Sequence, residues 1–172
     1  MPRSALCTLG LCAGLLAACG GEEPPANDTP APTVGDLESQ GQLPTLDRSA
    51  GLAGPDAGGN GIRDDIDAWI AGRQATPELR AALAQLARAY QASVVRGSQD
   101  AAAALDAAAQ SGQAISCIMT HSASEAEGMQ AMSVLRKMTA NTRERVQAYL
   151  AYARALDGAV MAVSDKDGCD AQ

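Results

Sequence analysis

The sequence predicts an all-α domain, packed as a small antiparallel bundle of about five helices. Of the 172 residues, 47% are hydrophobic but only 2% are aromatic, so the core must consist of aliphatic side chains and alanine, the strongest helix former. Apolar residues recur at helical spacing from residue 62 onward. Capping residues and short connections separate the helical segments, which favours antiparallel neighbours.

The first two helices have clear starts. For the helix expected over residues 63–72, Asp64 and Asp65 suit the positive N-terminal end, and apolar side chains from residue 62 to 70 form one face. The next begins at Thr76-Pro77-Glu78, which supplies an N-cap, a proline at the first helical position and an acid in the first turn. Its apolar stripe continues to a stop at Gly97.

The third helix is expected to start after Ser98 or Asp100. Because an interior glycine costs about 1 kcal/mol relative to alanine, we expect a kink at Gly112. The apolar stripe of this helix consists of Leu105, Ala108, Gly112, Ile115 and Met119.

Capping patterns also start the last two helices. The pairs Ser122–Glu125 and Ser124–Glu127 are alternative capping boxes for the fourth helix. The fifth starts at residues 141–144, and its apolar period continues past Gly158, so we expect it to reach about residue 163. Its apolar positions are Val146, Tyr149, Leu150, Ala153, Leu156, Val160 and Val163.

The N-terminal segment has the pattern of an export signal. Arg3 precedes an apolar run over residues 5–16 that is too short to remain as a membrane span. The run ends in Leu16-Ala17-Ala18-Cys19, which resembles the lipobox of bacterial lipoproteins. The resemblance implies that residues 1–18 are a signal peptide and that Cys19 carries lipid. With Gly20 after the cysteine, it further implies an outer-membrane lipoprotein facing the periplasm, with surface exposure left open.

Residues 19–60 are expected to form a lipidated, disordered tether to a helical domain at 61–172. This segment holds six of the eight prolines and several glycines, and it keeps no regular apolar period. The alternative is that residues 34–50 pack on the domain through their leucines.

The cysteines predict one disulfide. Of the five, Cys7 and Cys12 lie in the signal peptide and Cys19 is the expected lipid carrier, which leaves Cys117 and Cys169. Two thiols in an exported protein pair by default. We expect Cys117 to lie off the main apolar stripe of its helix, where the tail could reach it. The alternative is that Cys117 and His121, four residues apart on one helical face, act as a metal pair or a catalytic couple, although no further ligand is evident in the sequence.

Residues 56–67 can be aligned with a twelve-residue calcium loop. The segment Asn60-Gly-Ile-Arg-Asp64-Asp65 resembles the calcium repeats of thrombospondin type 3. The twelve-residue segment 56–67 departs from the calcium-loop pattern at two positions. Gly58 offers no side-chain oxygen, and Asp67 replaces the glutamate of the last position. The alternative is a metal-free turn followed by helix-capping acids. The candidate Ca²⁺ ligands are Asp56, Asn60, the Ile62 carbonyl, Asp64 and Asp67.

Charge limits the partners. Acidic residues outnumber basic residues by 20 to 13, which excludes nucleic-acid binding as the expected function. Arg136, Lys137, Arg143 and Arg145 form a basic cluster, interpreted either as a solvated face or as a site for an acidic partner. Met119, Met129, Met132 and Met138 are either core residues or the lining of a groove.

No nucleophile with a base and no phosphate-cradling loop is recognisable, so we expect a non-catalytic protein. The whole arrangement resembles small uncharacterised lipoproteins of Gram-negative bacteria. The resemblance brings no known activity. The first hypothesis is a lipid-anchored envelope module that is non-catalytic and acts through protein contacts in the periplasm, with no cofactor. The alternative is a module that responds to Ca²⁺.

Overall fold

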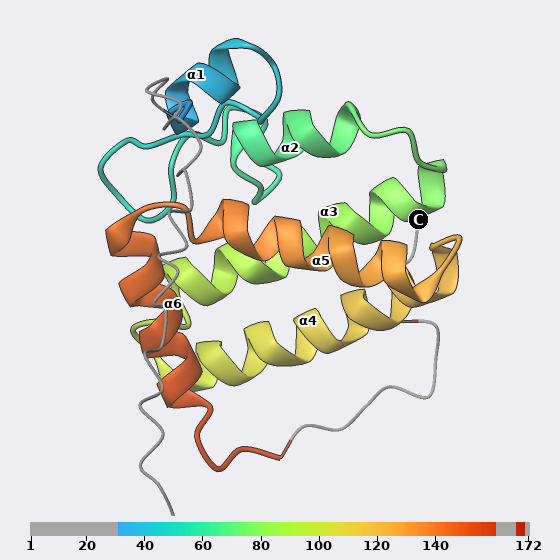
Figure 1. Ribbon diagram of the computed structural model, residues 1–172. Coiled ribbons are helices and arrows are strands. Elements are labelled where there is room, and N and C mark those ends of the chain that lie inside the picture. The colour runs from blue at the N-terminus through green and yellow to red at the C-terminus, as the bar shows by residue number, and fades with distance from the viewer. Residues whose placement is uncertain (1–30, 161–167, 171–172) are drawn as a thin grey trace, which may run out of the picture. The chain divides into compact units, whose positions relative to one another are not determined.

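The computed structural model describes residues 31–160 and 168–170, and its described part is helical without a strand (Figure 1). This confirms the predicted all-α fold class. There are six helices rather than about five, because one short helix precedes the predicted set. Their bounds are α1 Val34–Ser39, α2 Asp64–Ala71, α3 Pro77–Val95, α4 Ala101–His121, α5 Glu125–Thr139 and α6 Arg143–Ala155. No helix in this part of the chain is long and apolar enough to cross a membrane.

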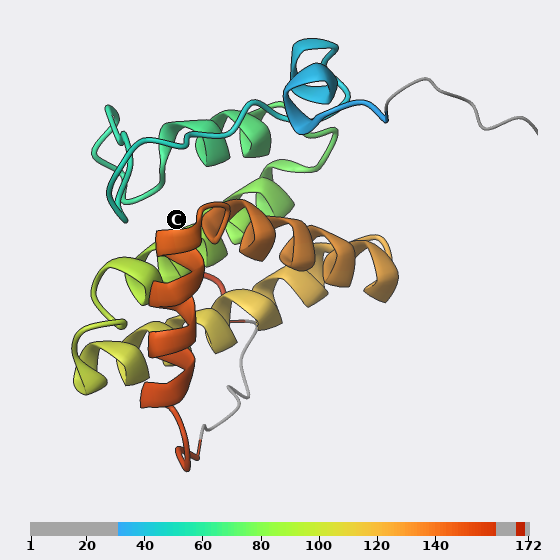
Figure 2. The same cartoon turned by 60° about the vertical axis from the view of Figure 1, so that its left-hand side comes forward.

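Helix α3 is the centre of the bundle. It packs against α2, α4, α5 and α6, and its long contact with α4 is visible in both orientations (Figures 1 and 2). Leu83 and Leu86 are fully buried, as are Ile66 of α2, Ile118 of α4 and Leu135 of α5, so four helices meet in one aliphatic core. A second, smaller cluster packs Tyr152 of α6 against alanines of α4.

Side-chain caps confirm most of the predicted helix starts. The hydroxyl of Thr76 accepts a hydrogen bond from the Leu79 N–H, and Asp100 caps α4 in the same manner. Of the two N-caps offered for α5, Ser124 is used: its hydroxyl accepts from the Glu127 N–H, while the Glu127 carboxylate accepts from the Ala123 N–H. Thr142 caps α6. Each cap satisfies a backbone donor that the helix leaves unpaired, which explains why local sequence was sufficient to locate these starts.

Helix α4 buries a different face from the predicted one. Leu105, Ile115 and Met119 are 46%, 37% and 37% exposed. The buried positions are Ala104, Ala107, Ala108, Ser111, Ala114, Cys117 and Ile118. Small side chains let α3 and α4 approach closely, and this close packing outweighs the burial of three larger side chains. The prediction that Cys117 lies off the core-facing stripe was therefore wrong. Helix α4 continues through Gly112 as one element.

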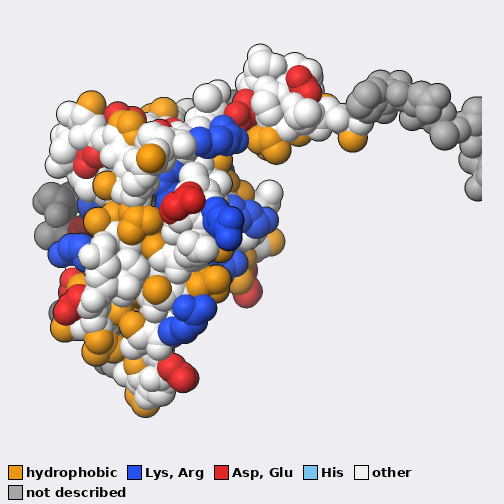
Figure 3. All heavy atoms as spheres, turned by 90° about the vertical axis from the view of Figure 1, so that its left-hand side faces the viewer, with side chains coloured by type: hydrophobic (Ala, Val, Ile, Leu, Met, Phe, Trp, Pro, Cys, Tyr) orange, Lys and Arg blue, Asp and Glu red, His pale blue; other side chains and the backbone are white. Residues whose placement is uncertain are grey.

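Helix α6 is shorter than expected, and the face that it buries differs from the predicted one. It ends at Ala155, and Gly158 has a left-handed φ of 75° that ends the helical path. Its buried side chains are Arg145, Ala148 and Tyr152, whereas Val146 and Leu150 are exposed. The predicted continuation over residues 161–163 lies outside the described residues. The side of the molecule that carries α6 shows apolar side chains scattered among polar ones (Figure 3).

Part of the segment 19–60, for which a disordered tether was predicted, is folded. Residues 19–30 lie outside the described part, but the unit that contains the helices begins at Thr33. Thr33 and Asp36 form a capping box on α1, and Leu46 packs against the main core. Part of the alternative is therefore observed: of the leucines at 37, 43 and 46, Leu46 packs against the main core, whereas Leu43 is 39% exposed. Hydrogen bonds and ion pairs hold residues 33–60 in place, which explains why the apolar residues of this segment show no helical or strand period.

Two fully buried arginines supply these contacts. Arg145 donates to the Asp47 carboxylate (2.6 Å), the Asp47 carbonyl (2.7 Å) and the Asn141 side chain (2.8 Å). Arg63 binds the Asp65 carboxylate with two nitrogens and donates to the Met138 carbonyl (2.9 Å). The two pairs are linked, because the Asp47 N–H donates to Asp65 (2.8 Å). We call these four charged residues the buried ion-pair network.

Gly54 lies where this network leaves no room for a side chain. Its φ is 68°, and a Cβ atom there would clash with the side chains of Arg63, Arg145 and Asp47. The segment before α2 thus depends on a glycine at this position.

The network predicts an acid-labile contribution to stability. Hydrogen bonding from Arg145 is the main cause that lowers the pKa of Asp47 from 3.8 to about 2. Because the folded-state pKa is depressed, the contribution is complete above the unfolded-state value and is lost as the pH falls through about 2. Its size is on the order of 1–2 kcal/mol, since Asp47 keeps some solvent exposure.

Urea denaturation at several values between about pH 5 and pH 2 measures this contribution. The Asp47→Asn variant should be less stable than the wild type at about pH 5, and the difference should shrink toward pH 2. A difference that stays constant across this range would show that the Asp47 carboxylate does not titrate as the geometry requires.

Candidate functional site

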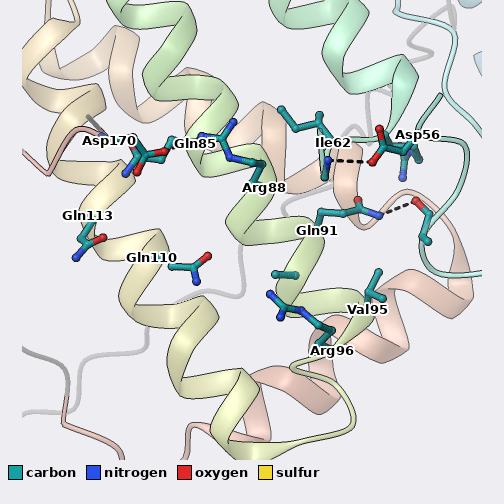
Figure 4. Close-up of a pocket in the computed structure, with 14 residues that line it drawn as sticks. Asp56, Ile62, Gln85, Arg88, Gln91, Val95, Arg96, Gln110, Gln113 and Asp170 are labelled. Atoms are coloured by element: carbon teal, nitrogen blue, oxygen red, sulfur yellow. Dashed lines mark hydrogen bonds and ion pairs between the residues drawn. The ribbon is translucent and has the colours of Figure 1, made fainter. Parts of the chain in front are cut away.

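A cleft of about 440 Å³ lies between α3, α4 and the 53–63 segment. Its volume is within the range of small-ligand and peptide pockets. Gln85, Arg88 and Arg96 lie along α3, Gln110 and Gln113 face them from α4, and the 53–63 segment forms the opposite wall (Figure 4). The remaining lining residues are Ala53, Asp56, Gly61, Ile62, Arg63, Gln91, Ala92, Val95 and Asp170. We call this concavity the Arg-Gln cleft.

The C-terminal tail closes one end of the cleft. Gln85 Nε2 donates to the Gly168 carbonyl (2.8 Å), and the Asp170 N–H donates to Gln85 Oε1 (3.1 Å). Arg88 forms an ion pair with the Asp170 carboxylate (2.7 Å). Gln85 is 7% exposed, and both ends of its side-chain amide are bonded to the tail, one to Gly168 and one to Asp170. Arg88 and Asp170 are more exposed, and their pair contributes little to stability.

The lining of the cleft also includes polar groups that no described residue pairs. The Arg96 side chain forms no ion pair with any described residue, and the Gln113 amide makes no hydrogen bond within the same part of the chain. Gln91 donates to the Ala53 carbonyl (2.6 Å), while its own Oε1 is buried without a protein partner. Cationic and amide groups thus face an apolar strip formed by Ala92 and Val95.

The predicted calcium ligands lie on the rim of this cleft and on the start of α2. The two carboxylate oxygens of Asp56 accept hydrogen bonds from the N–H groups of Asn60 (3.1 Å) and Gly61 (2.9 Å). Asn60 Oδ1 accepts from the Ile62 N–H (2.9 Å), and its Nδ2 donates to Asp67 (3.2 Å). Asp64 accepts from the Ala57 N–H (2.9 Å).

These bonds close the loop using its own donors. They bring Asp56, Asn60 and Gly61 into one turn and tie Asp67 to Asn60. The carboxylates of Asp56, Asp64 and Asp67 do not form a three-ligand cluster in the described part of the chain. A cation at this loop would therefore have to displace backbone hydrogen bonds to reach the same oxygens.

Cys117 and Cys169 are joined, which confirms the predicted disulfide. Cys117 and Cys169 have Cα atoms 4.9 Å apart and are separated by 52 residues in sequence. Cys117 is buried, and His121 lies one turn later on α4. The ligand atoms of Cys117, His121 and Cys169 all lie within 4.8 Å of one another. The sequence identified the first two as neighbours but gave no reason to add the third.

The basic cluster does not form one surface. Arg145 is completely buried in the ion-pair network, so the interpretation of this residue as part of a solvated face or partner site was wrong. Arg136 and Lys137 lie exposed in the last turn of α5, where cations complement the helix dipole. The methionines also divide: Met132 and Met138 are core residues, while Met119 and Met129 are exposed.

The Arg-Gln cleft itself could not be predicted from the sequence. Arg88 and Gln91 occupy polar positions on the outer side of a leucine-striped helix, where such residues are ordinary. They become walls of a cavity only because the 53–63 segment and the tail pack beside α3.

Comparison with known proteins gives no match. No family model, no curated protein and no solved structure is significantly similar to this chain.

Proposed function

We propose that this chain is a lipid-anchored envelope lipoprotein whose helical domain is a non-catalytic binding module. The observation that carries the second part is the Arg-Gln cleft. Its lining holds arginine and glutamine side chains but no serine, cysteine or histidine, so the described lining residues suit recognition rather than covalent chemistry. The lipobox-like segment ending in Cys19 supports the anchor.

The cleft chemistry favours an extended acidic peptide segment of an envelope protein as the ligand. Arg96 offers a guanidinium for a carboxylate, and glutamine amides match the donors and acceptors of a peptide backbone. The apolar strip at Ala92 and Val95 suits a small aliphatic side chain. Because the chain as a whole is acidic, its long-range field would not attract an acidic peptide, so the proposed preference depends on contacts within the cleft.

Site-specific photocrosslinking in intact cells tests this proposal. A photoreactive residue at Gln113, on the cleft wall, should give a discrete adduct that Arg96→Glu abolishes. The matched control is the same residue at Gln147, exposed on α6, which should give no adduct. Equal labelling from both positions, or an adduct that Arg96→Glu leaves unchanged, would contradict the cleft as the recognition site. Mass spectrometry of the N-terminal peptide tests the anchor, because an unmodified Cys19 or an intact Met1 refutes it.

A calcium-responsive module remains the second candidate, because the rim of the cleft is the Asp56–Asp67 loop. The turn made by Asp56, Asn60 and Gly61 already places side-chain oxygens on one short segment. Calorimetry should then show binding of Ca²⁺ by the wild type and weaker binding by Asp56→Ala. Absence of heat with millimolar Ca²⁺ refutes this candidate.

A further inference from the structure

We propose that Cys117, His121 and Cys169 form a zinc site once their disulfide has been reduced. The three side chains supply two sulfurs and one imidazole nitrogen, a donor set that zinc binds in proteins. They are the only three described residues whose Cys, His, Asp or Glu ligand atoms gather in this manner. This site is separate from the Arg-Gln cleft and does not depend on the function proposed for it.

The spacing of the ligand atoms suits the ion. At Zn–S distances of about 2.3 Å and tetrahedral angles, two thiolates on one zinc lie about 3.8 Å apart. All three ligand atoms lie within 4.8 Å of one another, so coordination requires only small side-chain adjustments. The fourth position is open to a water molecule.

The site requires that the tail remain near α4 when the disulfide is broken, and contacts other than the disulfide also hold the tail. Gln85 holds the Gly168 carbonyl and the Asp170 N–H, the two backbone groups that flank Cys169. Arg88 adds an ion pair to Asp170. These contacts come from α3 and do not involve the sulfur–sulfur bond, so we expect them to hold the tail in the reduced chain.

Reagents can reach the cluster. A hollow of about 360 Å³ opens onto His121, Cys117 and Cys169, with Glu78 and Asp170 at its edge. The His121 and Cys169 side chains are partly exposed, and His121 makes no hydrogen bond to another described residue. Glu78 adds negative charge beside the place where a cation would lie, whereas the Asp170 carboxylate is paired with Arg88, which also lines the hollow.

The chemistry balances with a dithiol as the reductant. Thiol–disulfide exchange transfers two electrons and two protons from the dithiol, which becomes a disulfide, to Cys117 and Cys169, which become thiols. Zn²⁺ then displaces one proton from each thiol and binds the neutral imidazole, so the coordinated unit carries no net charge.

Cobalt and zinc titrations of the purified full-length chain test the proposal. After reduction with a phosphine, one equivalent of Co²⁺ should produce sulfur-to-cobalt charge-transfer absorption and the visible bands of a tetrahedral site, and Zn²⁺ should remove them. The oxidised chain should give neither signal. His121→Ala should weaken Zn²⁺ binding at least tenfold, because losing a direct ligand should cost no less than losing a residue that only orients a ligand. The matched control, Thr120→Ala, is one residue away and exposed, and should bind as the wild type does.

A thermal readout keeps the test independent of the spectra. Zn²⁺ should raise the Tm of the reduced chain, because coordination restores the link between α4 and the tail, and it should leave the Tm of the oxidised chain unchanged. The proposal is overturned if reduced wild type takes up no Co²⁺ or Zn²⁺. It is equally overturned if His121→Ala binds zinc as tightly as the wild type.

Discussion

Arg145→Ala is expected to destabilise the domain by about 3–5 kcal/mol, the cost of removing one partner from a buried ion pair. The guanidinium is fully buried and binds Asp47 through both its carboxylate and its carbonyl. Its removal leaves the Asp47 charge without its cation and the Leu52 and Asn141 acceptors without a donor. Urea denaturation followed by circular dichroism measures the loss.

Arg143→Ala is the matched control for this variant. Arg143 lies two residues earlier on the same helix, is exposed, and forms no ion pair with a described residue. Its replacement should change the free energy of unfolding by less than about 0.5 kcal/mol. If both variants lose the same small amount, Arg145 does not hold the 33–60 segment in place, and the ion-pair network has no structural role.

Removing the disulfide by replacing Cys117 and Cys169 with alanine should have an effect of similar size. A cross-link that closes a loop of 52 residues stabilises the folded state by about 4 kcal/mol when only the entropy of the unfolded chain is counted. The helices should remain, because the aliphatic core around Leu83 and Leu86 does not depend on the tail.

The control for this variant is Ser116→Ala, beside Cys117 on α4 and outside the core. It should unfold with nearly the wild-type free energy. Denaturation of the oxidised, reduced and double-alanine forms separates the cross-link from the side chains. A double-alanine variant as stable as the oxidised wild type would contradict a structural role for the bond.

Local chemistry explains which parts of the fold were predictable. Thr76, Asp100, Ser124 and Thr142 each cap the helix that follows, and a cap acts over three residues of sequence. The disulfide followed from counting thiols. The caps and the disulfide can be predicted without knowing which helices pack against each other.

Features that join distant segments were not predictable. Asp47 and Arg145 are 98 residues apart, and neither belongs to an apolar period, so the pattern of residues 33–60 indicated a tether although the segment packs. The face of α4 was misassigned because hydrophobicity favours Leu105 and Ile115, whereas close helix packing favours alanine. The Arg-Gln cleft combines three segments, and the zinc ligands combine a helix with the tail.

If Cys19 is the lipid anchor proposed above, the start of the packed unit at Thr33 limits how far the domain can reach from a bilayer. With the lipid on Cys19, only fourteen peptide units separate the anchored residue from the first helix cap, and a chain of that length spans at most about 50 Å. A spacer running to residue 60 would have allowed nearly three times that radius. Under this proposal, the Asp47–Arg145 pair lies between the spacer and the bundle along the chain, so it is one of the contacts that would carry tension from the anchor.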